Sequence, residues 1–264
     1  MIFTVFFTCV ALGSLVGFLA GLLGIGGGLI VVPALVYLLP LLGADNSIVM
    51  PMALATSLAA IVVTSSSAAY AHHRNNNIPW KLAKPLMIVV ALGALMGAFI
   101  ADLMSTQALK NFFAVAVMLL ASYMLASIAN PKERTLPSTL TLQVISWLTG
   151  IVASLMGMAG GAILVPALTY FGMSLRHAIG IATACGVLVA LFGSLGYIYT
   201  GFSQSLLPSW SVGYVYLPAL LGIVLSSSFF APYGVKFASK LPVKTLKKAF
   251  AVFLILVAIK MMTS

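Results

Sequence analysis

The chain has 264 residues, of which 62% are hydrophobic and 6% are charged, and its mean hydropathy is +1.18. Soluble domains carry about a quarter charged residues, so this composition excludes a water-soluble globular protein and predicts a polytopic membrane protein. The formal net charge of +10 is interpreted as basic loops at the cytoplasmic face of a membrane and not as a nucleic-acid-binding surface.

Hydropathy divides the chain into helical segments, five in each half. They are expected at about 3–23, 28–42, 49–71, 83–103 and 108–128, and then at about 140–157, 161–173, 178–200, 212–235 and 245–262. The first segment lacks the features of a signal peptide, so we expect it to be retained as a helix. A membrane-spanning helix needs about 20 residues. The second segment of each half is shorter, begins at glycines and contains Pro33 or Pro166, which predicts a half-helix that starts at a chain break.

The two halves are a sequence repeat. Gly17 to Tyr37 matches Gly150 to Tyr170 at an offset of 150 − 17 = 133, a register that superposes both glycine breaks and both prolines. Loop lengths differ further on, so the offset becomes 127 and then 137; these offsets pair Thr56 with Thr183, Tyr70 with Tyr197, Gly97 with Gly234 and Lys110 with Lys247. We therefore expect one membrane domain over residues 1–264, with a first repeat at 1–129, a second at 138–264, and the polar stretch 130–137 between them.

Basic residues predict that equivalent loops lie on opposite faces of the membrane. The loop after the third segment carries Arg74, Lys81 and Lys84, whereas its counterpart at 200–211 has no charge. The pattern reverses after the fourth segment, where the second half carries Lys236, Lys240, Lys244, Lys247 and Lys248. Lys and Arg accumulate on the cytoplasmic side. The halves are therefore expected to have inverted topology, with the termini outside and the connector inside.

The expected fold class is an all-α integral membrane protein made of two inverted-topology repeats, with about 8–10 membrane segments. Inverted topology requires an odd number of crossings in each half. Three transmembrane helices plus a Gly-broken helical hairpin satisfy this condition, and so do five full crossings. The sequence leaves both arrangements open.

The glycine breaks are the expected substrate site. In lipid, a helix can be interrupted only where protein or a water-lined cavity receives the freed backbone groups. If Gly27-Gly28 and Gly160-Gly161 begin half-helices, their unpaired N–H groups and positive dipole ends face the bilayer centre, an arrangement that suits an anion. The alternative is that the glycines only allow close helix packing.

Carboxylates are too few for a cation carrier. Asp45, Asp102 and Glu133 are the only three, and all fall in predicted loops. A cation carrier normally has an intramembrane carboxylate, so the chain is not expected to move metal ions or amines. Coupling to a proton or to Na⁺ through carbonyls and hydroxyls stays open.

Hydroxyl side chains complete the predicted site. Thr56 and Thr183 hold equivalent positions near a helix start, and Ser57 follows Thr56. The alternative role for a hydroxyl in a membrane helix is a bond to a carbonyl of its own helix. The predicted substrate-binding residues are Gly26, Gly27, Gly28, Pro33, Thr56, Ser57, Gly160, Gly161, Pro166 and Thr183. Tyr70 and Tyr197, which end the third segment of each half, are expected to be interface anchors in preference to gates.

At the breaks the chain resembles a known family. Gly24-Ile-Gly-Gly-Gly-Leu-Ile-Val-Val-Pro-Ala-Leu35 and Gly157-Met-Ala-Gly-Gly-Ala-Ile-Leu-Val-Pro-Ala-Leu168 are similar to the two signature stretches of the sulfite exporter TauE/SafE family, and Arg176 to Thr183 and Gly201 fit its second half. The resemblance implies transport of small sulfur-containing or organic anions, such as sulfite, sulfoacetate or other sulfonates, often outward across the cytoplasmic membrane. In the second half, Ala159 replaces a glycine and Ala184 stands opposite Ser57, so the half-sites are unequal, as an asymmetric anion would require.

The sequence thus predicts a multi-pass secondary transporter of the cytoplasmic (inner) membrane that works by alternating access. An anion channel and a non-transporting membrane scaffold are the alternatives. No set of nucleophile, base and orienting residue is present, so no enzyme activity is expected. No metal site or other cofactor is expected, and Cys9 and Cys185 are interpreted as buried small hydrophobes. The expected partners are a small anionic substrate and membrane lipids; the coupling ion and a homodimer are left open.

Overall fold

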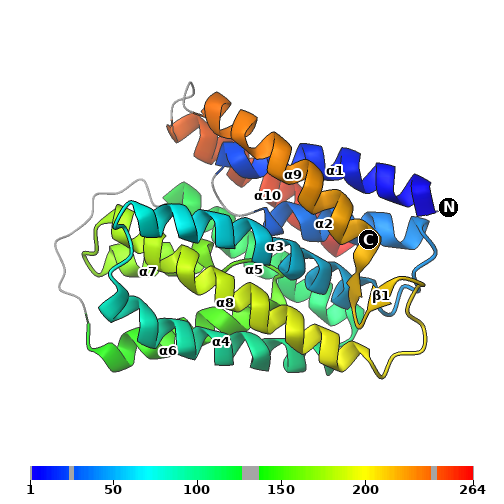
Figure 1. The fold of residues 1–264 in the computed structure, drawn as a ribbon, viewed down its shortest axis with the longest axis horizontal. Helices are drawn as coiled ribbons and strands as arrows, with labels where there is room; N and C mark the ends of the chain where they lie inside the picture. The colour runs from blue at the N-terminus through cyan, green and yellow to red at the C-terminus, as the bar shows by residue number, and fades with distance from the viewer. Residues whose placement is uncertain (1, 24–26, 127–136, 239–242, 264) are drawn as a thin grey trace.

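The structure is a computed structural model that describes residues 2–23, 27–126, 137–238 and 243–263. The described part is all-α apart from one small β-hairpin, as Figure 1 shows. The first half contains α1 (Ile2–Leu23), α2 (Gly28–Leu41), α3 (Val49–Arg74), α4 (Trp80–Asp102) and α5 (Thr106–Ala126). The second half contains α6 (Thr139–Leu155), α7 (Gly161–Tyr170), α8 (Leu175–Gly201), β1 (Ser211–Val212), β2 (Val215–Tyr216), α9 (Leu217–Ala238) and α10 (Val243–Thr263). The predicted connector at 130–137 lies almost wholly outside the described residues.

Helix lengths agree with a membrane protein. By length and composition, α3, α4 and α8 are apolar enough to cross a bilayer. The helices α1, α5, α9 and α10 contain 22, 21, 22 and 21 residues. At about 1.5 Å per residue they match a hydrocarbon layer of about 30 Å. By contrast, α2 and α7 contain 14 and 10 residues, which confirms that the second helix of each half is short.

The main helix–helix contacts join a helix of one half to a helix of the other half. In Figure 1 they run roughly along the long axis of the molecule, with α1 beside α9 on one side and α4 beside α6 on the other. The central helices α3 and α8 pack against each other, and α5 packs against α10. The first helix of each half therefore packs against the fourth helix of the other.

Equivalent glycines make very close contacts in both of these helix pairs. A Cβ atom added at Gly17 of α1 would lie 2.4 Å from Cα of Ser227 in α9, and one added at Gly150 of α6 would lie 2.2 Å from the carbonyl oxygen of Val90 in α4. The offsets 150 − 17 = 133 and 227 − 90 = 137 convert the first contact into the second. Small residues let helix backbones approach closely where lipid provides no hydrophobic driving force. The sequence repeat is thus also a repeat of contacts.

The start of α9 corrects one expectation. We expected a helix from about residue 212, but residues 211–216 form the hairpin of β1 and β2, and α9 begins at Leu217. The hairpin is tucked against α8: a Cβ at Gly213 would lie 2.3 Å from the Ile198 carbonyl oxygen. In addition, the backbone N–H of Tyr216 donates to Thr56 Oγ1 at 3.0 Å. These contacts with α3 and α8 favour a hairpin at residues 211–216, although the apolar sequence there predicted a helix.

The packing of α4 against α6 generates a stability prediction. Replacing Gly150 with Leu forces the two helices apart, because the new side chain meets backbone atoms that cannot rotate away. Overpacking of this kind costs about 1–3 kcal/mol. We expect Gly150→Leu to lower the thermal unfolding temperature in detergent, measured by intrinsic fluorescence. Val144→Leu, on an exposed position of the same helix, is the matched control; an equal effect in both variants would contradict the packing argument.

Candidate functional site

Both half-helices start at a glycine in the left-handed backbone region. The residue preceding α2 is Gly27 with φ of 71°, and the residue preceding α7 is Gly160 with φ of 74°. Glycine adopts this conformation without steric cost, so the predicted starts at Gly28 and Gly161 are confirmed. Neither start has a side-chain cap. The first-turn N–H groups of each half-helix are therefore left to other acceptors.

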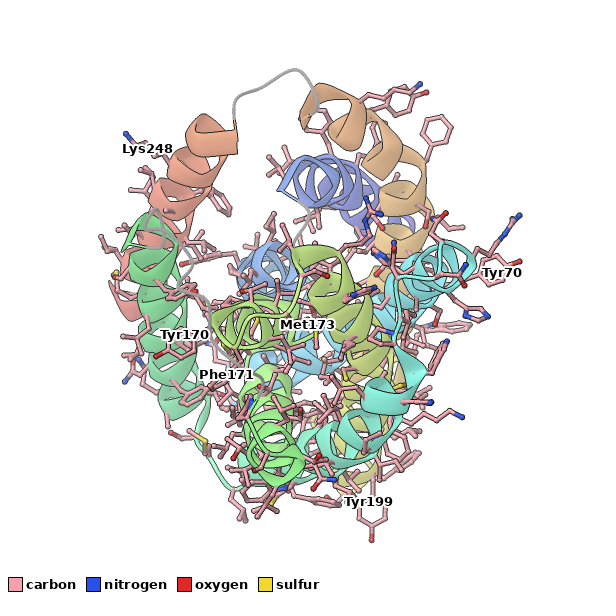
Figure 2. The ribbon with its side chains drawn as sticks, turned by 90° about the vertical axis from the view of Figure 1, so that its left-hand side faces the viewer. Tyr70, Tyr170, Phe171, Met173, Tyr199 and Lys248 are labelled. Carbon is pink, nitrogen blue, oxygen red and sulfur yellow. The ribbon has the colours of Figure 1, made fainter. Side chains whose placement is uncertain are left out.

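The two breaks meet inside the protein. A Cβ added at Gly28 would lie 2.5 Å from the carbonyl oxygen of Gly157 and 2.9 Å from Cα of Met158. The start of α2 thus lies directly against the break that precedes α7. From this region α2 runs to the right-hand end of Figure 1, whereas α7 runs to the left-hand end. Figure 2 looks onto that left-hand end, with Tyr170 and Phe171 at the end of α7 near its centre. The start of α2 therefore contacts the segment that precedes α7, and the C-terminal ends of the two half-helices point to opposite ends of the molecule.

Ser57 joins α3 to the second break by a hydrogen bond. Its side chain is fully buried, and its hydroxyl donates to the Gly157 carbonyl at 2.8 Å. This bond satisfies a carbonyl that the break removes from α6. The hydroxyl keeps lone pairs for further donors. The equivalent second-half residue is Ala184, which has no hydroxyl, so only one of the two half-sites has this link.

The two predicted threonines have different surroundings. Thr56 is fully buried and accepts the Tyr216 N–H from the hairpin. Thr183 is half-buried and donates to the Ile179 carbonyl of its own helix at 2.7 Å, which is the alternative role considered for such hydroxyls. Pro33 is buried within α2, and Pro166 is half-buried within α7. Gly26 lies outside the described residues.

Sequence reasoning missed a buried polar pair next to the second break. Ser154 is fully buried near the end of α6, and its hydroxyl has no partner among the described residues. The Tyr197 hydroxyl donates to the Ser154 carbonyl at 3.3 Å. The expectation that Tyr197 anchors the protein at the interface is wrong, because its side chain is fully buried; Tyr70 is 64% exposed. The one available signal was a serine in the apolar run before the break.

The described interior carries hydroxyls and helix dipoles but no charge. Its buried polar residues are Thr56, Ser57, Ser65, Ser146, Thr149, Ser154, Ser194, Thr200, Ser226 and Ser227. Asp102 is exposed at the end of α4, where its carboxylate accepts the Tyr214 hydroxyl at 3.2 Å. Burial, and then the charge of Asp102, raise the pKa of Tyr214 to about 12, so this hydroxyl stays protonated. No group of three or more metal-ligating side chains occurs in this part of the chain.

The comparisons with known proteins agree with this architecture. The family described as sulfite exporter TauE/SafE matches residues 9–261. The chain belongs to the TauE/SafE family.

Relatives that align with nearly the whole of this TauE/SafE chain are named as membrane transporters. A probable membrane transporter protein of Haemophilus influenzae is 41% identical over 260 residues, which is 98% of either chain. Probable membrane transporter proteins of Methanocaldococcus jannaschii and Bacillus subtilis are both 24% identical, covering 90% and 96% of this chain and 88% and 95% of their own. No solved structure matches the chain. This TauE/SafE protein is thus a membrane protein of a transporter family.

The hydrogen bond between Ser57 of α3 and the second break generates a second prediction. Ser57→Ala leaves the Gly157 carbonyl buried without its partner, which costs about 1–3 kcal/mol. We expect this variant to unfold at a lower temperature than the intact chain in the same detergent. Ser66→Ala, at an exposed position of the same helix, is expected to have almost no effect. Equal unfolding temperatures for all three proteins would show that the bond contributes nothing.

Proposed function

We propose that this TauE/SafE protein is a secondary transporter that moves small sulfur-containing or organic anions out of the cell by alternating access. Sulfite and sulfonates such as sulfoacetate are the proposed substrates. The observation that carries the proposal is the contact between the uncapped start of α2 and the break that precedes the uncapped start of α7, in a buried region where the described residues supply hydroxyls and no charge. Backbone N–H groups and positive dipole ends are suited to bind an anion.

The expected affinity suits a carrier. Each helix end contributes about 0.3–2 kcal/mol to the binding of a negative charge, so two ends and a few hydroxyls bind an anion without trapping it. A buried lysine or arginine would bind it more strongly and slow its release. The unequal half-sites, with Ser57 facing the second break and Ala184 at the equivalent position, favour an anion with one charged end and one different end.

We further propose that the halves are inverted repeats in the cytoplasmic membrane, each with three spans and one Gly-broken hairpin. The N-terminus and the α2–α3 connection lie at the same end of the molecule in Figure 1, which supports the hairpin reading of α1 and α2. The basic residues of the described helix ends gather at the other end, at Arg74, Lys81, Lys84, Arg176, Lys236, Lys244, Lys247 and Lys248. A basic end of this kind faces the cytoplasm.

Cysteine labelling tests this topology. Asn75 follows α3 and Ser205 follows α8, and both are exposed. The native Cys9 and Cys185 are buried and give little background. We expect a membrane-impermeant maleimide to label Ser205→Cys in intact cells and Asn75→Cys only after permeabilisation. Labelling of both variants in intact cells, or of Asn75→Cys alone, would rule out inverted repeats in this orientation.

Transport into proteoliposomes tests the function itself. We expect saturable uptake of sulfite or a sulfonate, with sulfate and taurine as comparisons and with imposed proton and sodium gradients to identify the coupling ion. Gly161→Val is the informative variant, because a Cβ at Gly161 has no neighbour within 4 Å. The side chain fits the fold but occupies space at the start of α7. Flux is expected to fall at least about tenfold, as for the loss of 1.4 kcal/mol of binding.

Ala68→Val, at an exposed position of α3, is the control and is expected to keep full flux. Counterflow of labelled anion indicates a carrier, whereas single-channel currents indicate an anion pore. If folded, intact protein moves no anion under any gradient, the transport proposal is wrong and a scaffold role replaces it.

A further inference from the structure

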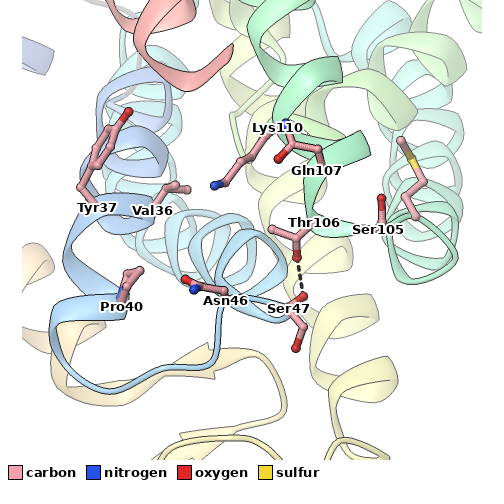
Figure 3. Close-up of a pocket in the computed structure, with 10 residues that line it drawn as sticks. Val36, Tyr37, Pro40, Asn46, Ser47, Ser105, Thr106, Gln107 and Lys110 are labelled. Atoms are coloured by element: carbon pink, nitrogen blue, oxygen red, sulfur yellow. Dashed lines mark hydrogen bonds between the residues drawn. The ribbon is translucent and has the colours of Figure 1, made fainter. Parts of the chain in front are cut away.

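A cavity with a mixed polar and apolar lining lies away from the glycine breaks. It has a volume of about 770 Å³ and lies between the C-terminal end of α2 and the N-terminal end of α5 (Figure 3). Its lining comes from α2, from the α2–α3 and α4–α5 connections and from the first turns of α5, and its polar members include Tyr37, Asn46, Ser47, Ser105, Thr106 and Lys110. This end of the molecule is the one that our proposed topology places outside the cell.

Lys110 supplies the positive charge of this cavity. In Figure 3 its side chain extends from α5 across the cavity toward Val36 and Asn46. No carboxylate lines the cavity, and the nearby Asp45 carboxylate accepts both the N–H and the hydroxyl of Ser47. Among the described residues, Lys260 is the other basic residue at this end of the molecule, and it does not line the cavity. Lys110 is the one charged side chain among the residues that line the cavity.

Neutral donors surround the ammonium group. The hydroxyl of Thr106 donates to the Ser47 carbonyl, which joins the two connections into one wall. Ser105 Oγ accepts the Ala108 N–H at 3.2 Å, so its own hydroxyl hydrogen can point elsewhere. The Asn46 amide also lines the cavity. One ammonium group with several N–H and O–H donors suits an anion that carries several oxygen atoms.

We propose that this cavity is an outer binding site for a small oxyanion, with the Lys110 ammonium group as its counter-charge and the side chains of Asn46 and Ser105 as further donors. The inference rests on the proposed function, because it makes the cavity a site that the transported anion occupies between the glycine breaks and the outer solution. The phosphate of a lipid headgroup shares this chemistry. The ligand that we assign is the free anion, because the cavity lies at the end of the molecule, between helix ends and the connections that join them.

The sequence repeat supports a role beyond local packing. Lys110 matches Lys247, and Tyr37 of the cavity lining matches Tyr170, which ends α7. Lys247 lies near the start of α10, at the opposite end of the molecule from Lys110. A lysine that only extends to the membrane surface does not need a counterpart at the equivalent position. Lys110 and its repeat counterpart Lys247 thus belong to helices that begin at opposite ends of the molecule, α5 and α10.

Lysine acetylation in nanodiscs tests the site without measuring transport. The intact protein in zwitterionic lipid is treated with an acetylating reagent, and modification of each lysine is followed by mass spectrometry with and without sulfoacetate. We expect the anion to slow acetylation of Lys110 about tenfold, the change that corresponds to 1.4 kcal/mol of binding, and to leave Lys260 unchanged. Equal slowing at both lysines would reflect ionic strength alone and would overturn the proposal, as would protection by phosphatidylglycerol but not by the free anion.

Transport measurements then connect the cavity to function. We expect Lys110→Gln to raise the half-saturating concentration of external anion about tenfold, Lys110→Arg to restore most of the affinity, and Lys260→Gln to behave as the intact chain. If the intact chain transports and all variants match it, the cavity proposal is wrong and the proposed function stands. If the intact chain does not transport, the proposed function is wrong. The proposed role of the cavity in transport is then also wrong, even if the anion protects Lys110 from acetylation.

Discussion

Every backbone N–H and carbonyl group within a bilayer needs a hydrogen-bond partner, and this constraint governs the architecture of the chain. The breaks before α2 and α7 free such groups at two points. The protein places one break against the other, so that Gly28 lies beside the Gly157 carbonyl, and Ser57 of α3 donates to that carbonyl. The partners of the broken helices therefore come from other helices. The interruptions of the helices therefore also bring the two halves into contact.

Helix packing around the breaks combines a tight frame with a polar centre. Contacts of α1 with α9 and of α4 with α6 depend on glycines whose Cα atoms lie almost against the opposing backbone. In the centre, α3 carries Thr56 and Ser57, which bond to the hairpin and to the second break. A frame of small residues keeps the helix axes close, and the hydroxyls of the centre satisfy the irregular backbone. Alternating access requires one set of helices to rock against another. A closely packed frame around a polar centre is suited to this motion.

Charged side chains are also separated from the centre of the protein. In the part of the chain that the structure describes, the buried polar side chains are hydroxyls, and the charged groups lie at the helix ends and in the connections. Burying an ion without a partner costs several kcal/mol, which is the physical reason for the lack of charged side chains in the described interior. Under the proposals made above, an anion passes from a basic cytoplasmic end through this neutral centre to a cavity where Lys110 is the positive group.

Local sequence determined the membrane class, the helices and the starts of both half-helices. Long apolar runs form helices in lipid whatever their neighbours, and a glycine such as Gly27 or Gly160 accepts a positive φ that other residues avoid. Tertiary structure alone decided the rest. Ser57 and Gly157 are 100 residues apart, and Thr56 and Tyr216 are 160 apart, so no local pattern indicates that they bond. The burial of Tyr197 and the hairpin before α9 likewise depend on the exchange of helix partners between the halves, because burial is set by what packs against a side chain and not by its own hydropathy.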